Sequence, residues 1–154
     1  MGKWLIYGYG NPGRMDDGLG NCFVEEMQAW LSQHGMENID TESNYQLNIE
    51  DAEKISSYER IIFVDASQEV IDNYAFTKVN PGNARVEFTM HAISPAYVQY
   101  LCEDLFKKKP DTYLLHIKGY KWDFKEELSE TAAQNMKAAL HFLQSELKRD
   151  YSNS

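Results

Sequence analysis

Apolar positions along the chain fall into two patterns. Three short continuous runs are rich in strand-forming residues, and runs of this length are typical of strands buried on both faces of a parallel sheet. These runs are 4–7, 60–64 and 112–117. Three longer stretches repeat their apolar residues every three or four positions, which predicts amphipathic helices. They cover 19–34, 95–106 and 129–147.

Weaker signals complete the alternation of strands and helices. The stretch 39–43 is a poor strand candidate, and 49–56 is typical of a short helix that is acidic near its start. The stretches 74–79 and 85–89 flank a turn at 80–83 and predict an antiparallel hairpin at one edge of the sheet. This order of elements indicates an α/β fold, with a mainly parallel sheet covered by helices on both sides.

Length and charge narrow the functional classes. A chain of 154 residues, 43% of them hydrophobic, predicts a single domain over 1–149 with a frayed tail at 150–154. The net charge of -9 argues against nucleic acid or an anionic membrane as a partner. No apolar stretch is long enough to span a bilayer, and the chain enters a strand without a secretory signal. Cys22 and Cys102 fall on apolar helix faces and are expected to be buried thiols, which favours a cytoplasmic location.

The stretch 6–20 passes from a strand to a helix through a glycine-rich loop that ends in Asp16 and Asp17. Such loops often bind phosphate at the N-terminus of the helix. Here the glycine spacing departs from the dinucleotide fingerprint, and the two carboxylates would repel phosphate, so a nucleotide-binding domain is a weak alternative. Because one aspartate is enough to cap a helix, we expect one of the pair to cap it and the other to face outward.

Acidic and histidine residues follow three of the predicted strands. Asp16 and Asp17 follow the first, Asp65 follows the clearest buried strand, and His91 follows the second hairpin strand. Because ligands of open α/β sheets bind beyond the carboxyl ends of the strands, we expect these side chains to converge. Taken singly, Asp65 could cap a turn and His91 could be a structural histidine. Their joint placement favours a divalent metal site, and such oxygen and nitrogen ligands suit zinc, nickel or iron. The other histidines are interpreted as structural: His34, His116 and His141.

Four motifs, taken in order, resemble the endopeptidases that mature nickel-iron hydrogenases. The first motif is the most specific because it joins the glycine loop to the acidic pair, and the resemblance spans nearly the whole chain. The motifs are Gly8-Tyr9-Gly10-Asn11 with Asp16-Asp17-Gly18-Leu19-Gly20, then Phe63-Val64-Asp65-Ala66, then Met90-His91 followed by Ser94-Pro95, and finally His116-Ile117-Lys118-Gly119-Tyr120 leading into Glu127-Leu128-Ser129.

This resemblance implies a five-stranded twisted sheet between helices. It also implies an enzyme that removes a C-terminal extension from the hydrogenase large-subunit precursor once nickel is in place. Metal binding is assigned to Asp17, Asp65 and His91, catalysis to Asp16, Asp17 and Asp65, and substrate binding to Gly10 and Asn11. Some members carry a histidine directly after the Ser-Pro pair, where this chain has Ala96. Alanine cannot bind metal, so we align His91 with the family's histidine.

The chemistry that fits these residues is attack by water. No serine or cysteine nucleophile with a base partner is predicted at this edge of the sheet. A divalent metal, with nickel favoured, would polarise the scissile carbonyl or lower the pKa of the water, and it either belongs to the protein or arrives with the substrate. A carboxylate would move the proton. The implied partner is the large-subunit precursor, and a monomer is favoured.

Two further alternatives stay open. A non-catalytic metal-sensing protein that binds the precursor without cutting it would use the same ligands. Peptidyl-tRNA hydrolase shares the opening strand and a loop like Gly10-Asn11-Pro12-Gly13, but it needs a tyrosine and a His-Asn pair after the loop, where this chain has Asp16 and Asp17. It also needs a basic surface for tRNA, and this chain is acidic.

Overall fold

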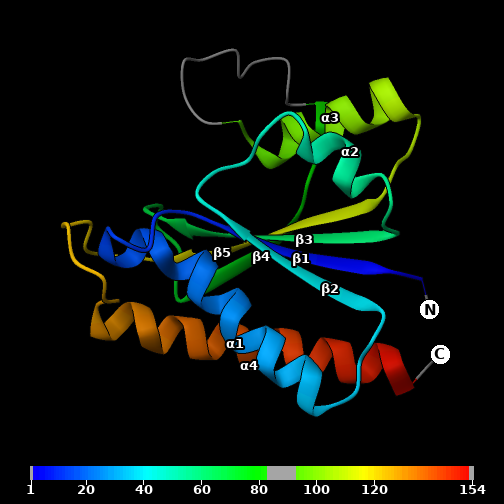
Figure 1. Ribbon diagram of the computed structural model, residues 1–154. Coiled ribbons are helices and arrows are strands. Elements are labelled where there is room, and N and C mark those ends of the chain that lie inside the picture. Colours follow the sequence, from blue (N-terminus) through cyan, green and yellow to red (C-terminus); the bar gives the residue numbers. More distant parts are fainter. Residues whose placement is uncertain (1, 83–92, 153–154) are drawn as a thin grey trace.

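The structure, a computed structural model, describes residues 2–82 and 93–152. Strands and helices alternate as predicted (Figure 1). The strands are β1 (Trp4–Tyr9), β2 (Ile39–Asn44), β3 (Arg60–Ser67), β4 (Tyr74–Lys78) and β5 (Asp111–Lys118). The helices are α1 (Leu19–Gln33), α2 (Asp51–Ile55), α3 (Pro95–Phe106) and α4 (Glu130–Ser152), and a 3-10 turn, η1, covers Met15–Gly18.

The five strands form one sheet in the order β2-β1-β3-β5-β4. Neighbouring strands are parallel except for the edge strand β4, which is antiparallel to β5. The predicted α/β class and the five-stranded, mainly parallel sheet are therefore confirmed. The expected partner of β4 in a hairpin, 85–89, lies outside the described residues. Parallel pairing brings the ends of β1, β2, β3 and β5 to one side of the molecule, which we call the carboxyl edge (Figure 1).

Two hydrophobic cores lie on opposite faces of the sheet, because successive residues of a strand point to opposite sides. Ile6 and Ile62 belong to the core covered by α1 and α4. Tyr7 and Phe63, their neighbours in sequence, belong to the core covered by α2 and α3. Figure 1 shows these helix pairs below and above the sheet. Burial on both faces explains why the central strands are continuous apolar runs.

Glycines let the start of α1 lie directly on the sheet. A Cβ atom on Gly20 would lie 2.4 Å from the carbonyl oxygen of Val64, and one on Gly8 would lie 2.1 Å from the carbonyl oxygen of Gly20. Both distances are far below van der Waals contact, so these positions require glycine. The glycines of this motif thus serve the packing of α1 against β1 and β3, and this packing sets η1 at the carboxyl edge.

The residues of α3 that are buried differ from those that its apolar periodicity predicts. The apolar periodicity of 95–106 places Leu105 and Phe106 on the inward face of this helix, but in the structure they are 61% and 38% exposed. The buried position is taken by Gln99, whose side-chain amide donates to the carbonyl of Pro110 and whose Oε1 accepts a hydrogen bond from the Thr112 hydroxyl. Satisfied hydrogen bonds allow a polar side chain to occupy a core position, which periodicity alone does not reveal.

The C-terminal part of the chain is more ordered than predicted. Helix α4 continues to Ser152, so the frayed tail expected at 150–154 is wrong for its first three residues. Asp150 lies 3.6 Å from the guanidinium of Arg60 in an ion pair that ties the last turn to β3. Cys22 and Cys102 are free thiols; Cys102 is buried as expected, whereas Cys22 is only half-buried. Among the described residues, no helix combines the length and apolar character needed to cross a membrane.

Candidate active site

Asp17 is positioned by the glycine loop. Its Oδ2 accepts a hydrogen bond of 3.0 Å from the backbone N–H of Asn11. Gly10 has a φ of 150°, and a Cβ atom there would lie 2.0 Å from the carbonyl oxygen of Asp17. The backbone N–H of Gly10 donates to the carbonyl of Asn44 at the end of β2. The loop therefore holds the half-buried Asp17 side chain at the carboxyl edge, and only glycine permits this approach.

Asp65 belongs to the strand and does not follow it. Strand β3 extends to Ser67, three residues beyond the predicted apolar run. Asp65 therefore lies within the last three residues of the strand. Burial, with a further contribution from the charge of Asp17, raises the pKa of the Asp65 carboxyl to about 7 against the opposing effect of hydrogen bonds from Tyr9 and the Ala66 N–H. Asp17 and Asp65 lie at the same edge of the sheet, and the charge of Asp17 acts on the Asp65 carboxyl.

The third expected metal ligand, His91, lies outside the described residues. Within 2–82 and 93–152, no three side chains of His, Cys, Asp or Glu form a group that could hold a metal ion. The described part of the site is thus a pair of carboxylates, Asp17 and Asp65. The three-ligand site stays a prediction.

Asp16 points away from its neighbour Asp17 and is fully buried. Its Oδ2 accepts hydrogen bonds from the N–H groups of Tyr120 and Lys121 at 2.7 and 2.9 Å. The backbone N–H and the hydroxyl of Ser129 also donate to this carboxylate, both at 2.7 Å. Burial alone would raise the pKa of Asp16, but these hydrogen bonds outweigh burial and hold it below the usual value.

This geometry corrects two expectations about the acidic pair. Neither η1 nor α1 has a side-chain cap, so neither Asp16 nor Asp17 caps the helix. Asp16 also has no exposed surface with which to touch a substrate. Its carboxylate instead fastens the segment 119–129, which follows β5, to the turn η1. Asp16 is therefore a positioning residue, and its assignment to catalysis is replaced by this role.

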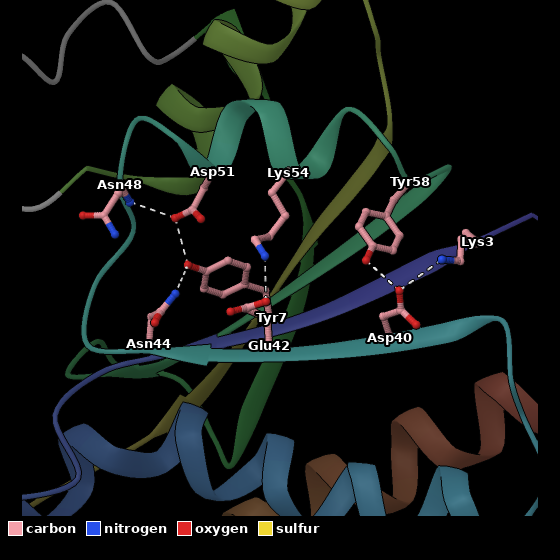
Figure 2. Close-up of polar contacts among 9 residues, drawn as sticks. All are labelled: Lys3, Tyr7, Asp40, Glu42, Asn44, Asn48, Asp51, Lys54 and Tyr58. Carbon is pink, nitrogen blue, oxygen red and sulfur yellow. Dashed lines mark hydrogen bonds and ion pairs between the residues drawn. The ribbon is translucent and has the colours of Figure 1, made fainter.

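A second buried network supports the glycine loop from the other side (Figure 2). The hydroxyl of Tyr7 in β1 donates to Asp51 Oδ2 and accepts from the side-chain amide of Asn44, both at 2.8 Å. Asp51 also accepts from the Asn48 N–H at 2.8 Å. Burial and the neighbouring Asp51 carboxylate raise the pKa of Tyr7 above its usual value, so the phenol stays protonated. The network fixes Asn44, whose carbonyl receives the Gly10 N–H.

Two residues near Asp65 were missed by the sequence analysis. Tyr9, at the end of β1, makes a hydrogen bond to the Asp65 side chain. His116, interpreted as structural, is the register partner of Asp65 on β5, so the two side chains share one face of the sheet. Burial lowers the pKa of His116, and Glu69 opposes that shift. Alternate residues of a strand point to the same face of the sheet. Counting along the apolar runs of β3 and β5 in this way could have placed His116 beside Asp65.

The substrate-binding assignment of Gly10 and Asn11 is not tested by their contacts. The Gly10 N–H and the Asn11 N–H are both used inside the protein, by Asn44 and Asp17. The side-chain carbonyl of Asn11 accepts from the N–H of Gly13 at 2.9 Å. These bonds make the loop rigid.

Comparison with solved structures identifies the fold. The [NiFe] hydrogenase maturation protease HycI from Thermococcus kodakarensis KOD1 superposes with a TM-score of 0.76 at 19% identity, over 95% of this chain and 92% of that one. The hydrogenase maturating endopeptidase HybD from E. coli gives 0.73 at 16% identity, over 96% and 93%. A hydrogenase 2 maturation peptidase from a Thaumarchaeota archaeon gives 0.68 at 18% identity, over 95% and 98%.

No family model and no curated protein matches the sequence. At these identities the likeness shows the fold, which is that of hydrogenase maturation proteases. The resemblance predicted from the four motifs is therefore confirmed at the level of the fold, over nearly the whole chain.

The acidic pair should separate into a stability residue and a site residue. Asp16→Asn places an amide NH₂ among four hydrogen-bond donors, so we expect the free energy of unfolding to fall by about 2–4 kcal/mol. Asp17→Asn keeps an acceptor for the Asn11 N–H and should cost less than about 1 kcal/mol. Urea unfolding of both variants beside the wild type measures this. Equal losses in the two variants would contradict the assignment.

The raised pKa of Asp65 predicts how stability changes with pH. Since the folded value of about 7 exceeds the unfolded value of about 4, the charged carboxylate destabilises the folded state progressively as the pH rises through this interval. Without metal, Asp65→Asn should exceed the wild type in unfolding free energy by about 1–4 kcal/mol near pH 8, and the difference should vanish near pH 4. A difference that is the same at both pH values would show that the carboxyl is not perturbed.

Proposed function

We propose that this protein is an endopeptidase that removes a C-terminal extension from the nickel-loaded large-subunit precursor of a nickel-iron hydrogenase. The observation that carries the proposal is the pair of half-buried carboxylates, Asp17 and Asp65, at the carboxyl edge of a hydrogenase-maturation-protease fold. A fold by itself does not define a reaction, so the proposal depends on the chemistry of this pair.

The donor set fits a divalent cation. The charge of Asp17 raises the cost of ionising Asp65 in this partly buried site, and a bound cation would offset that cost. We propose that Asp17, Asp65 and His91 hold or sense this metal, with nickel favoured because the precursor would bring it. A bound divalent metal would polarise the scissile carbonyl and favour attack by water.

The chain's own residues would divide the remaining work. A carboxylate of the site, Asp17 or Asp65, would take a proton from the attacking water and return it to the leaving amine. Tyr9 orients the Asp65 carboxyl through its hydrogen bond. Asp17 is held by the Asn11 N–H, and we propose that the rigid loop at Gly10 and Asn11 lines the path of the substrate. Asp16 keeps the segment 119–129 in place around them.

A cleavage assay tests the proposal. Purified precursor from the same genome, with and without nickel, is incubated with the protein, and the products are identified by mass spectrometry. We expect cleavage near the C-terminus of the nickel-loaded precursor only. Asp17→Asn should lower the cleavage rate by about 100-fold or more, because it removes one negative charge from the site while keeping the size of the side chain.

The controls separate the possible functions. Lys137→Ala, an exposed change on α4, should cleave like the wild type. Full cleavage of nickel-free precursor would remove the gating by nickel. If the loaded precursor binds but stays intact, the protein is a non-catalytic metal-sensing partner of the precursor.

A further inference from the structure

Most of the exposed large apolar side chains among the described residues lie at the carboxyl edge. Among the described residues, the exposed large apolar side chains number seven, and five of them lie in the loops that follow β2, β3 and β5. These five, which we call the apolar rim, are Tyr45, Ile49, Val70, Tyr120 and Phe124. The other two, Leu105 and Phe106, end α3 next to the start of β5, at the opposite edge. Val70 and Phe124 are 102% and 86% exposed, which leaves their apolar surface in water.

The loops that carry the rim are bonded to one another. The Gly119 N–H donates to the carbonyl of Ser67 at 3.0 Å, which joins the ends of β5 and β3. The Met15 N–H donates to the carbonyl of Lys125 at 2.8 Å, which joins η1 to the loop of Phe124.

Arg14, from the glycine loop, reaches the same segment. Its guanidinium donates to the carbonyl of Trp122 and lies 5.3 Å from the centre of the Phe124 ring. Together with the Gly10–Asn44 hydrogen bond, these contacts connect all four loops at the edge. These bonds preorganise the loops, so the side chains of the apolar rim stay exposed to solvent.

The charges between the rim residues are mainly negative. The loops 45–50, 68–73 and 119–129 carry six exposed carboxylates and two exposed lysines. The carboxylates are Glu50, Glu69, Asp72, Asp123, Glu126 and Glu127, and the lysines are Lys121 and Lys125. A partner would be complementary to this surface if its own contact face had an apolar centre bordered by Lys and Arg.

We propose that the apolar rim is the docking surface for the folded body of the precursor protein, which presents an apolar face bordered by basic side chains. The inference rests on the proposed function, because the rim residues lie in loops at the same edge of the sheet as Asp17 and Asp65. A peptide bond delivered to that edge by a folded protein must bring the protein against these loops. Exposed aromatic side chains on a rigid support are the groups that usually dominate such interfaces.

Steady-state kinetics with nickel-loaded full-length precursor tests the rim. Val70→Ser combined with Phe124→Ser should raise KM by about 10-fold or more and leave kcat close to the wild-type value. Leu105→Ser, an equally drastic change at the opposite edge, should leave both constants unchanged. Phe124→Trp, which keeps a large aromatic ring, should retain the wild-type KM. Raising the salt from about 50 mM to about 500 mM should increase the wild-type KM, because it screens the acidic border.

Each outcome bears on one proposal or on both. If the wild type cleaves the precursor and the double variant keeps the wild-type KM, the docking role of the rim is overturned and the proposed peptidase activity stands. If the wild type binds without cleaving and the double variant loses about 10-fold in affinity, the rim stands and the peptidase activity fails. If the wild type neither binds nor cleaves the precursor, both are overturned. Thermal melting of the double variant close to that of the wild type is the control for folding.

Discussion

One buried carboxylate holds the carboxyl edge of the sheet together. A buried carboxylate is costly unless it is hydrogen-bonded, and four donors from the segment 119–129 surround Asp16 and make its charged form the stable one. Ser129 also accepts the Ala132 N–H at the start of α4, so the same residue begins the last helix and binds the first acidic residue. The ends of β1 and β5 are thereby fixed relative to each other.

That constraint gives the neighbouring aspartate its role. With Asp16 turned inward, Asp17 stays at the surface, where the Asn11 N–H holds it near Asp65. On the side of β2, the hydrogen bonds of Tyr7 hold Asn44 in place, and Asn44 in turn binds the glycine loop (Figure 2). A site built between loops is usually mobile, but here each loop is bonded to its neighbour, and the same bonds leave the apolar rim exposed.

Local patterns predicted the fold, and long-range contacts limited the prediction of the site. Continuous runs identify β1, β3 and β5 because strands covered on both faces admit few polar residues. The placement of Asp17 and Asp65 at one edge could be predicted because the carboxyl ends of parallel strands share that edge; their role as metal ligands stays a prediction. The role of Asp16 could not, since its donors lie 104 to 113 residues further along the chain. Gln99 was missed for the same reason: its partner Thr112 belongs to another element.

The central claim is that Asp17, Asp65 and His91 form one metal site, and calorimetric titration with nickel and with zinc tests it most directly. The wild type should bind weakly, and its affinity should rise between about pH 5 and about pH 8, because the carboxyl of Asp65 and the imidazole must lose their protons before they can bind. The variant that combines Asp17→Ala, Asp65→Ala and His91→Ala should show no binding. Equal binding by this variant and the wild type would contradict the account.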